Sequence, residues 1–141
     1  MSEHSVQSVI DHLLDNDRFS AWLGIEVVAL DKGSCTISMK IREEMLNGFD
    51  IVHGGITFAF ADSALAIASN GYNQLSVALE TSMSFSAPVK IGDQLFAQAE
   101  EVSRTNKIGV YNILITNQHQ TTVGLFKGTV YRTSKSLLEN D

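Results

Sequence analysis

Few residues of this chain can form cross-links, backbone kinks or a positively charged surface. Its 141 residues include one cysteine and one proline, and 16 aspartates and glutamates outnumber 10 lysines and arginines. A single cysteine excludes an internal disulfide and a cysteine-based metal cluster. The formal net charge of −6 argues against a nucleic-acid-binding protein, which needs a basic face. It also means that the capture of any negatively charged ligand must be local.

The chain also lacks a hydrophobic run long enough to cross a membrane. The most apolar stretch, residues 56–69, is too short and contains Asp62. The residues after Met1 show neither the basic start nor the apolar core of a signal peptide. With 44% hydrophobic and 18% charged residues, the composition is typical of a globular protein. We therefore expect a single domain over residues 1–141, located in the cytoplasm, with no membrane or nucleic-acid partner.

Helical spacing of apolar residues is confined to the N-terminal region and to one central stretch. Residues 6–14 carry apolar side chains on one helical face, and Asp17 is a candidate N-cap for a short helix over 18–23. Residues 1–23 are thus an N-terminal helical segment, whose second helix is expected to bury Phe19, Trp22 and Leu23. Residues 54–71 are apolar on nearly every side, which indicates a helix enclosed by the rest of the fold.

The remaining segments alternate between apolar and polar residues, as strands do. Strands are predicted over 25–30, 34–41, 77–85, 95–102, 108–116 and 122–133. Because short turns connect them, they predict an antiparallel sheet. The fold class is therefore α+β, with one sheet curled around one enclosed helix and a frayed polar tail over 134–141.

Asp62 is the residue most informative about function. A carboxylate inside an enclosed apolar helix is costly unless it is paired or protonated, and such groups often serve as acids, bases or nucleophiles. The structural alternative is a helix that starts at Asp62, with the carboxylate as its N-cap. The apolar segment 58–61 before Asp62 favours a helix that has already begun.

His53, Gly54 and Gly55 precede the apolar part of this helix. Two glycines let the backbone turn sharply and approach a ligand, and N–H groups at a helix start carry partial positive charge. They are candidates for holding a carbonyl oxygen and the charge that develops on it. A simple Gly-Gly turn explains the same residues, and His53 alone fits stacking, capping or catalysis. Asn47-Gly48, just upstream, is first a turn signal, although the Asn47 amide is also suited to position water or substrate.

Other reactive side chains carry weaker signals. Cys35 lies on the apolar phase of a regular strand, which indicates a packing role. Glu80 is either solvated or turned toward the site. His4, His12 and His119 share no element with metal-ligand spacing, so we expect no metal.

The spacing of the two main features predicts a site shared between two chains. Gly54 and Asp62 are eight positions apart, roughly 12 Å along a helix that rises 1.5 Å per residue. A carboxylate and an oxyanion donor that act on one carbonyl carbon must each lie about 3 Å from it. Two antiparallel copies of the helix, one from each subunit, meet this requirement more easily than one copy does.

The motifs Asn47-Gly48, Val52-His53-Gly54-Gly55 and Ala61-Asp62 resemble those of hotdog-fold acyl-CoA thioesterases, and the chain is most similar to the phenylacetate-degradation (PaaI-type) branch. The likeness covers nearly the whole chain. It implies a curved antiparallel sheet around a central helix, with a homodimer as the minimal active unit and often a homotetramer. It also implies hydrolysis of an acyl-CoA, aryl-acetyl or medium-chain, to free acid and coenzyme A. Coenzyme A is then part of the substrate and no cofactor is expected.

The resemblance further implies roles for individual residues. Asp62 would be the catalytic carboxylate, either activating water or attacking the thioester itself. Gly54 would polarise the carbonyl through its N–H, Asn47 would help to place substrate or water, and His53 would support that loop. In such enzymes Asp62 comes from one subunit and Asn47 and Gly54 come from the other.

Substrate-binding residues are less sharply specified. Some relatives place a serine or threonine early in the strand after the helix to hold the attacking water, where this chain has Ala78. Two nearby hydroxyl residues are substitutes if their strand faces suit, and two cations in a turn are candidates for the coenzyme A phosphates. The expected substrate-binding set is Gly55, Ala78, Thr81, Ser82, Arg104 and Lys107.

Two other functions are possible on the same fold, and the residues favour neither. A non-catalytic acyl-CoA-binding or sensing module on the same fold gains nothing from a buried carboxylate near a carbonyl. A dehydratase that acts on hydroxyacyl thioesters needs a histidine placed opposite the acid, whereas His53 precedes the helix.

Overall fold

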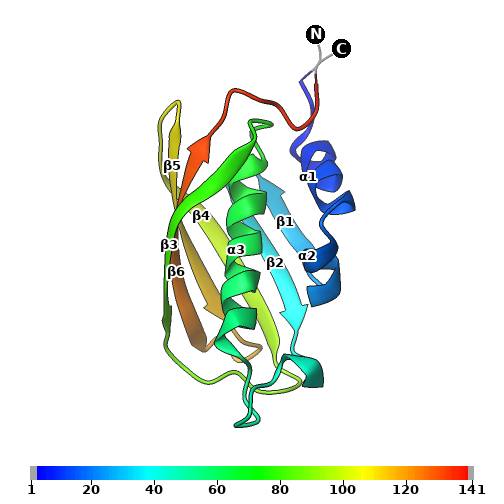
Figure 1. Ribbon diagram of the computed structural model, residues 1–141, viewed down its shortest axis with the longest axis vertical. Helices are drawn as coiled ribbons and strands as arrows, with labels where there is room; N and C mark the ends of the chain where they lie inside the picture. Colours follow the sequence, from blue (N-terminus) through cyan, green and yellow to red (C-terminus); the bar gives the residue numbers. More distant parts are fainter. Residues whose placement is uncertain (1–2, 140–141) are drawn as a thin grey trace.

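The computed structural model describes residues 3–139, and the helices and strands expected from the sequence are present in it. Two short helices begin the chain, and one long helix follows the first two strands (Figure 1). The elements in order are α1 (Val6–Asp15), α2 (Arg18–Leu23), β1 (Glu26–Asp31), β2 (Ser34–Lys40), the 3-10 helix η1 (Glu43–Met45), α3 (Gly54–Asn70), β3 (Ser76–Phe85), β4 (Gln94–Arg104), β5 (Ile108–Thr116) and β6 (Thr122–Arg132). Only η1 was not anticipated.

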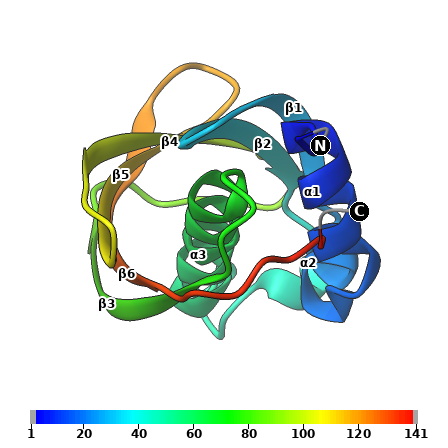
Figure 2. The ribbon, with the colours of Figure 1, turned by 90° about the horizontal axis from the view of Figure 1, so that it is seen from above.

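The six strands form one antiparallel sheet in the order β1-β2-β4-β5-β6-β3. The sheet curls around α3, and α1 and α2 close one flank of that helix (Figure 2). The expected α+β architecture, a curved sheet around one enclosed helix, is confirmed. No helix in residues 3–139 has the length and apolarity that crossing a membrane requires.

Helix α3 packs closely against the sheet because β6 offers it a glycine. Phe60, Ala61, Ala64 and Leu65 are fully buried on the sheet side of the helix. A Cβ atom placed on Gly128 of β6 would lie 2.6 Å from Cδ2 of Leu65. The missing side chain therefore sets how near the helix can approach the strand.

Two expectations about the N- and C-terminal segments were wrong. Phe19 and Trp22 are 52% and 47% exposed, and of the expected apolar trio only Leu23 is buried. Helix α2 has only six residues and therefore buries only a narrow face. The Phe19 and Trp22 rings lie outside that face and stack on each other. The Arg42 guanidinium lies 5.0 Å from the Trp22 ring.

The tail is held in place rather than frayed over residues 134–139. The Asn73 side-chain oxygen accepts from the backbone N–H groups of Leu137 and Leu138, which both pack against the core. The His4 ring nitrogen lies 2.7 Å from the Glu139 carbonyl oxygen. Residues 140–141 of the expected tail lie outside the described residues.

Replacing Gly128 by alanine should destabilise the protein. The added methyl group would push Leu65 away from its packed position, and overpacking of this kind costs about 1–3 kcal/mol. Urea unfolding at constant protein concentration measures the change. Gly48→Ala is the matched control, because no atom lies within 4 Å of the position of its Cβ. Equal midpoints for the two variants would show that Leu65 can move freely.

Candidate active site

The start of α3 leaves one backbone N–H available to a ligand. His53 is the N-cap, and its Nδ1 accepts a hydrogen bond of 2.9 Å from the Gly55 N–H. Acceptance by Nδ1 requires that nitrogen to be unprotonated, so the ring proton is on Nε2. The Gly54 N–H has no acceptor among the described residues. Gly54 is thus the candidate oxyanion donor, whereas the N–H of Gly55, which was expected to bind substrate, is already engaged by His53.

The Asn47 side chain organises the loop that leads to His53. Its Oδ1 accepts from the backbone N–H groups of Phe49 (2.8 Å) and Ile51 (3.4 Å). The His53 N–H in turn donates to the Met45 carbonyl at 2.9 Å. The turn interpretation of Asn47 is therefore confirmed. Its Nδ2 makes no hydrogen bond within residues 3–139 and is the part of the amide that can donate to a ligand.

A pocket of about 440 Å³ brings Asn47 and Gly54 together. It lies at the N-terminal end of α3. Its lining includes residues 51–52 of the preceding loop, Phe85 at the end of β3, and residues 86–89 that follow this strand. Its walls are mainly apolar and are formed by Ile51, Val52, Phe85, Ala87, Pro88, Val89 and Val123. An apolar pocket with a few polar groups at one end is typical of a site for a mostly hydrocarbon ligand.

Thr57 lines the same pocket and was not anticipated from the sequence. It lies one turn after Gly54 on the same helical face, is 2% exposed, and its Oγ1 has no hydrogen-bond partner among the described residues. A buried hydroxyl without a partner is unusual and indicates a position where a ligand or a local rearrangement completes the bonding. The sequence offered no signal for it, because one threonine in an apolar helix is compatible with ordinary packing.

Asp62 lies on the one side of α3 that the described chain leaves open. Gly55, Ala59 and Ala66 share this side. The opposite side of α3 is covered by the sheet, and α2 covers Ser63, whose hydroxyl contacts that of Ser20. The helix begins eight residues earlier, which excludes the N-cap alternative. Asp62 has no ion pair within residues 3–139. Burial raises the pKa of its carboxyl group above the ordinary aspartate value.

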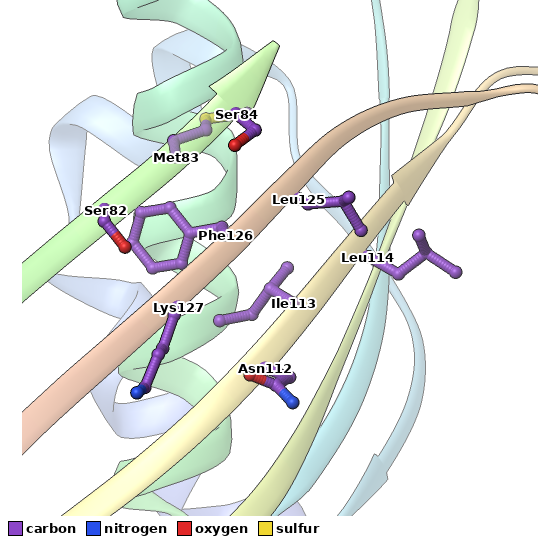
Figure 3. Close-up of a pocket in the computed structure, with 9 residues that line it drawn as sticks. All are labelled: Ser82, Met83, Ser84, Asn112, Ile113, Leu114, Leu125, Phe126 and Lys127. Carbon is purple, nitrogen blue, oxygen red and sulfur yellow. The ribbon is translucent and has the colours of Figure 1, made fainter. Parts of the chain in front are cut away.

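Strand β3 presents the expected hydroxyl residues to opposite faces of the sheet. Ala78 and Thr81 pair with Val130 and Gly128 on the face that carries α3. Ser82 pairs with Lys127 and lines a second pocket of about 410 Å³ on the outer face, where both side chains appear in Figure 3. The expectation that Ser82 contributes to the site is therefore wrong. Glu80 is likewise exposed and pairs with Thr129, so it is solvated rather than turned toward α3.

The two cations expected to bind coenzyme A phosphates have different surroundings. Arg104 is already paired, because its Nε lies 3.1 Å from Glu101 and its guanidinium lies 4.3 Å from the Tyr72 ring. Lys107 has no ion-pair partner among the described residues. The turn between β4 and β5, where both are found, lies toward the end of the molecule at which α3 ends (Figure 1).

Nothing in the described part of the chain suggests a metal centre. No three His, Cys, Asp or Glu side chains within residues 3–139 come together so that they could hold a metal ion. Cys35 is buried, its thiol contacts the Ala64 carbonyl oxygen at 3.4 Å, and burial raises its pKa to about 12. It is therefore a packing residue, as expected.

Residues 49–124, which include both Gly54 and Asp62, match the thioesterase superfamily. The chain belongs to that family. The thioesterase is 38% identical to the acyl-coenzyme A thioesterase PaaI of Escherichia coli over 85% of its own length and 86% of the relative's. The expected family and thioester hydrolase activity are thus confirmed.

Solved structures support the same assignment. The E. coli PaaI protein from the phenylacetic acid degradation operon matches with a TM-score of 0.91 and 34% identity, over 93% of this chain and 95% of the other. A variant of the phenylacetic acid degradation protein PaaI from Thermus thermophilus matches with a TM-score of 0.80 and 33% identity, over 83% and 100%. The hotdog fold of the thioesterase is therefore also confirmed.

Replacing Asp62 by asparagine should stabilise the thioesterase near pH 7. Because the pKa of the folded state is raised, this group favours folding below the ordinary aspartate pKa of about 3.9, and this contribution is lost as the pH rises through the raised value. At pH 7 the charged carboxylate therefore opposes folding, and asparagine removes that effect. Urea midpoints should rise at pH 7, and the difference should shrink toward pH 4. Glu100→Gln, an exposed carboxylate on β4, should change neither; a lower midpoint for Asp62→Asn at pH 7 contradicts the prediction.

Thr57→Val should leave the folded thioesterase at least as stable as the wild type. The substitution keeps the shape and removes a buried hydroxyl that has no partner, a group that costs on the order of 1–3 kcal/mol. Thr133→Val is the contrasting control, because the Thr133 hydroxyl donates to the Leu75 carbonyl at 2.7 Å and its loss should be destabilising. Thermal unfolding of both variants tests this, and a large loss for Thr57→Val would reveal a bond that the hydroxyl makes within the protein.

Proposed function

We propose that this thioesterase hydrolyses acyl-CoA and that each active site takes Asp62 from one subunit and Gly54 and Asn47 from the other. The observation that carries the proposal is the position of Asp62 on the open side of α3, where it is a partly buried carboxylate without an ion-pair partner in the described chain. The relative with 38% identity is an acyl-coenzyme A thioesterase, which supports the substrate class.

Two uncovered surfaces support a homodimer. Strand β3 is the edge of the sheet, pairs only with β6 within the described chain, and exposes Val77, Leu79 and Phe85. A long apolar edge strand is prone to pair with a second chain. Beside it, the open side of α3 carries glycine and alanine around Asp62, and these small residues allow another helix to come close. A second copy that joins β3 to β3 covers both surfaces.

The dimer brings together groups that a single chain separates. Within one chain, Gly54 and Asp62 are roughly 12 Å apart along the axis of α3. When two α3 helices run antiparallel, the N-terminus of one lies beside the middle of the other. The Gly54 N–H of one subunit and the Asp62 carboxylate of its partner then face the same carbonyl, and two equivalent sites result.

The proposed chemistry uses these two groups on opposite sides of the thioester. The Gly54 N–H and the positive end of the α3 dipole stabilise the negative charge that develops on the carbonyl oxygen. Asp62 either takes a proton from a water that attacks the carbonyl carbon, or attacks that carbon itself to give an anhydride that water then cleaves. In both routes the C–S bond breaks, and the thiolate leaves and takes up a proton. The raised pKa of Asp62 makes it a better proton acceptor than an ordinary aspartate.

The acyl group is proposed to occupy the pocket at the start of α3. A volume of about 440 Å³ with apolar walls accommodates an aryl-acetyl or a medium-length acyl chain. Asn47 and Gly54 line this pocket, and Ala78 and Thr81 lie on the α3 face of the adjoining edge strand. Association of dimers into a homotetramer, a place in phenylacetate degradation and a cytoplasmic location complete the proposal.

Mixing two inactive variants tests the shared site. Asp62→Asn removes the carboxylate, and Gly54→Pro removes the N–H. Proline is tolerated at the first helical position, and His53 already has φ −65 and ψ 131, the conformation that a residue before proline prefers. Each pure variant should lose orders of magnitude in thiol release from acyl-CoA while remaining dimeric.

Unfolding and refolding the two variants together should restore activity. Random pairing gives half mixed dimers, each with one intact site, so about a quarter of the wild-type rate is expected. If both residues served a site within one chain, no mixture would regain activity. Size-exclusion chromatography provides the control that each variant still forms dimers. Wild-type rates for Asp62→Asn alone would refute the assigned role of the carboxylate.

A further inference from the structure

Three residues with polar side chains line the pocket at the start of α3, and two of these side chains already have hydrogen-bond partners. The Asn47 Oδ1 accepts from two backbone N–H groups of its own loop. The Ser86 Oγ donates to the Thr122 carbonyl oxygen at 3.1 Å. The third residue is Thr57, whose Oγ1 has no hydrogen-bond partner among the described residues. Thr57 therefore brings an unused donor and an unused acceptor to a pocket with mainly apolar walls.

Burial makes the missing partner of Thr57 significant. The residue is 2% exposed, so its hydroxyl gains little from water in place of a protein partner. Buried hydroxyl groups are nearly always hydrogen-bonded, because desolvation without a new bond costs free energy. A threonine in a helix has two accessible χ1 rotamers, and rotation between them exchanges the methyl group and the hydroxyl at the surface of the pocket. A ligand with a polar group at this depth can therefore complete the bonding of Thr57.

The helix fixes the spacing between Thr57 and the proposed oxyanion donor. Thr57 follows Gly54 by three residues, which is roughly 4.5 Å along the axis of α3 and on nearly the same helical face. Each of the two groups holds an oxygen at about 2.8–2.9 Å, the usual length of such hydrogen bonds. A ligand that bonds to both groups therefore carries two oxygens that lie about 5 Å apart.

This spacing selects one position on an acyl chain. Three successive bonds of an extended chain span about 3.5 Å, as they do in a peptide backbone. An oxygen on the second acyl carbon is three bonds from the carbonyl oxygen, about 3.5 Å, which is too near. An oxygen on the third carbon is four bonds away, up to about 4.7 Å, which fits. A hydroxyl suits the site better than an oxo group, because it can both donate to Thr57 and accept from it.

We propose that Thr57 is a specificity-determining residue, and that its hydroxyl binds a hydroxyl on the third carbon of the acyl group. The preferred substrates are then 3-hydroxyacyl thioesters of coenzyme A. This inference rests on the proposed function, because it takes the thioester carbonyl oxygen to lie at the Gly54 N–H. The apolar walls of the pocket hold the rest of the acyl group. A substrate without the hydroxyl leaves Thr57 unpaired, which is how a site built for a hydroxyl discriminates.

Two substrates of the same shape test the proposal. 3-Hydroxybutanoyl-CoA, in the better of its two enantiomers, and 3-methylbutanoyl-CoA differ only in a hydroxyl or a methyl group on the third carbon. The wild type should show a kcat/KM about tenfold higher for the hydroxylated substrate, the effect of one net hydrogen bond. Thr57→Val should reverse this preference, because its added methyl group meets the substrate methyl and leaves a substrate hydroxyl unpaired. Thr57→Ser keeps the hydroxyl and should keep the wild-type preference.

The matched control is Ser86→Ala, which removes from the same pocket a hydroxyl that already has a partner. It should affect the two substrates equally and so leave their ratio unchanged. Equal kcat/KM values of the wild type for both substrates, or an unchanged preference in Thr57→Val, overturn the proposal. So does the loss of the dimer in Thr57→Val, measured by size-exclusion chromatography, because the hydroxyl then bonds to the second subunit rather than to substrate.

A wider panel and direct binding separate this inference from the proposed function. If the wild type hydrolyses other acyl-CoA thioesters but neither of these two, the substrate class inferred from Thr57 is wrong while the proposed function stands. If it hydrolyses no acyl-CoA at all, the proposed function fails, and calorimetry with the two intact thioesters measures the preference instead. Tighter binding of 3-hydroxybutanoyl-CoA that is lost in Thr57→Val then supports the role of the hydroxyl, and equal binding by both proteins overturns it.

Discussion

The enclosure of α3 by a single curved sheet is the constraint on which the other features of this thioesterase depend. The helix buries its apolar residues on the sheet side and against α1 and α2, and it leaves one side uncovered. Only on that side can a carboxylate exist in an otherwise apolar helix without a partner in its own chain. Asp62 is there, partly shielded from water, which raises its pKa. The same partial enclosure that makes the carboxylate unfavourable for folding makes it suitable for accepting a proton.

The N-terminus of the helix shows a division of tasks between adjacent N–H groups. His53 accepts from Gly55 and thereby fixes the first turn, while Asn47 holds the preceding loop through its oxygen. Both side chains therefore use their acceptor atoms for structure. The Gly54 N–H and the Asn47 Nδ2 have no acceptor among the described residues, and both residues line the pocket. Such donors can stabilise a carbonyl oxygen that acquires negative charge.

The sequence predicted the order and nature of the elements because the two-residue period of strands and the 3.6-residue period of helices are strong signals in this chain. It could not predict the faces of β3, because a bulge between Ala78 and Glu80 shifts the register. As a result Ala78 and Thr81, three positions apart, lie on the same face, which simple alternation forbids. The exposure of Phe19 and Trp22 did not follow from the apolar pattern, because a six-residue helix has only a narrow inward face, and Ser20 and Leu23 occupy it.

Similarly, only the tertiary structure shows that the Thr57 Oγ1 and the Arg132 Nε have no hydrogen-bond partner among the described residues, since a hydrogen-bond deficit is not encoded in residue type. The family motif pointed to Asp62, Gly54 and Asn47 as candidate site residues. The resemblance implies that Asp62 and Gly54 of one site come from different subunits. The rise of 1.5 Å per residue along α3 gives a physical reason for this expectation, because it separates the two residues within one chain.

The absence of a side chain at Gly128 bears on chemistry at some distance from it. Leu65 settles into the space above that glycine and lies one turn beyond Asp62 on the same helix. Residue 128 of β6 therefore sets the distance between α3 and the sheet. That distance also sets how far the Asp62 carboxylate lies from solvent and from a neighbouring subunit. In this architecture the proton affinity of the acid can be altered by the bulk of residues on the strand below, without any change among the groups that face the substrate.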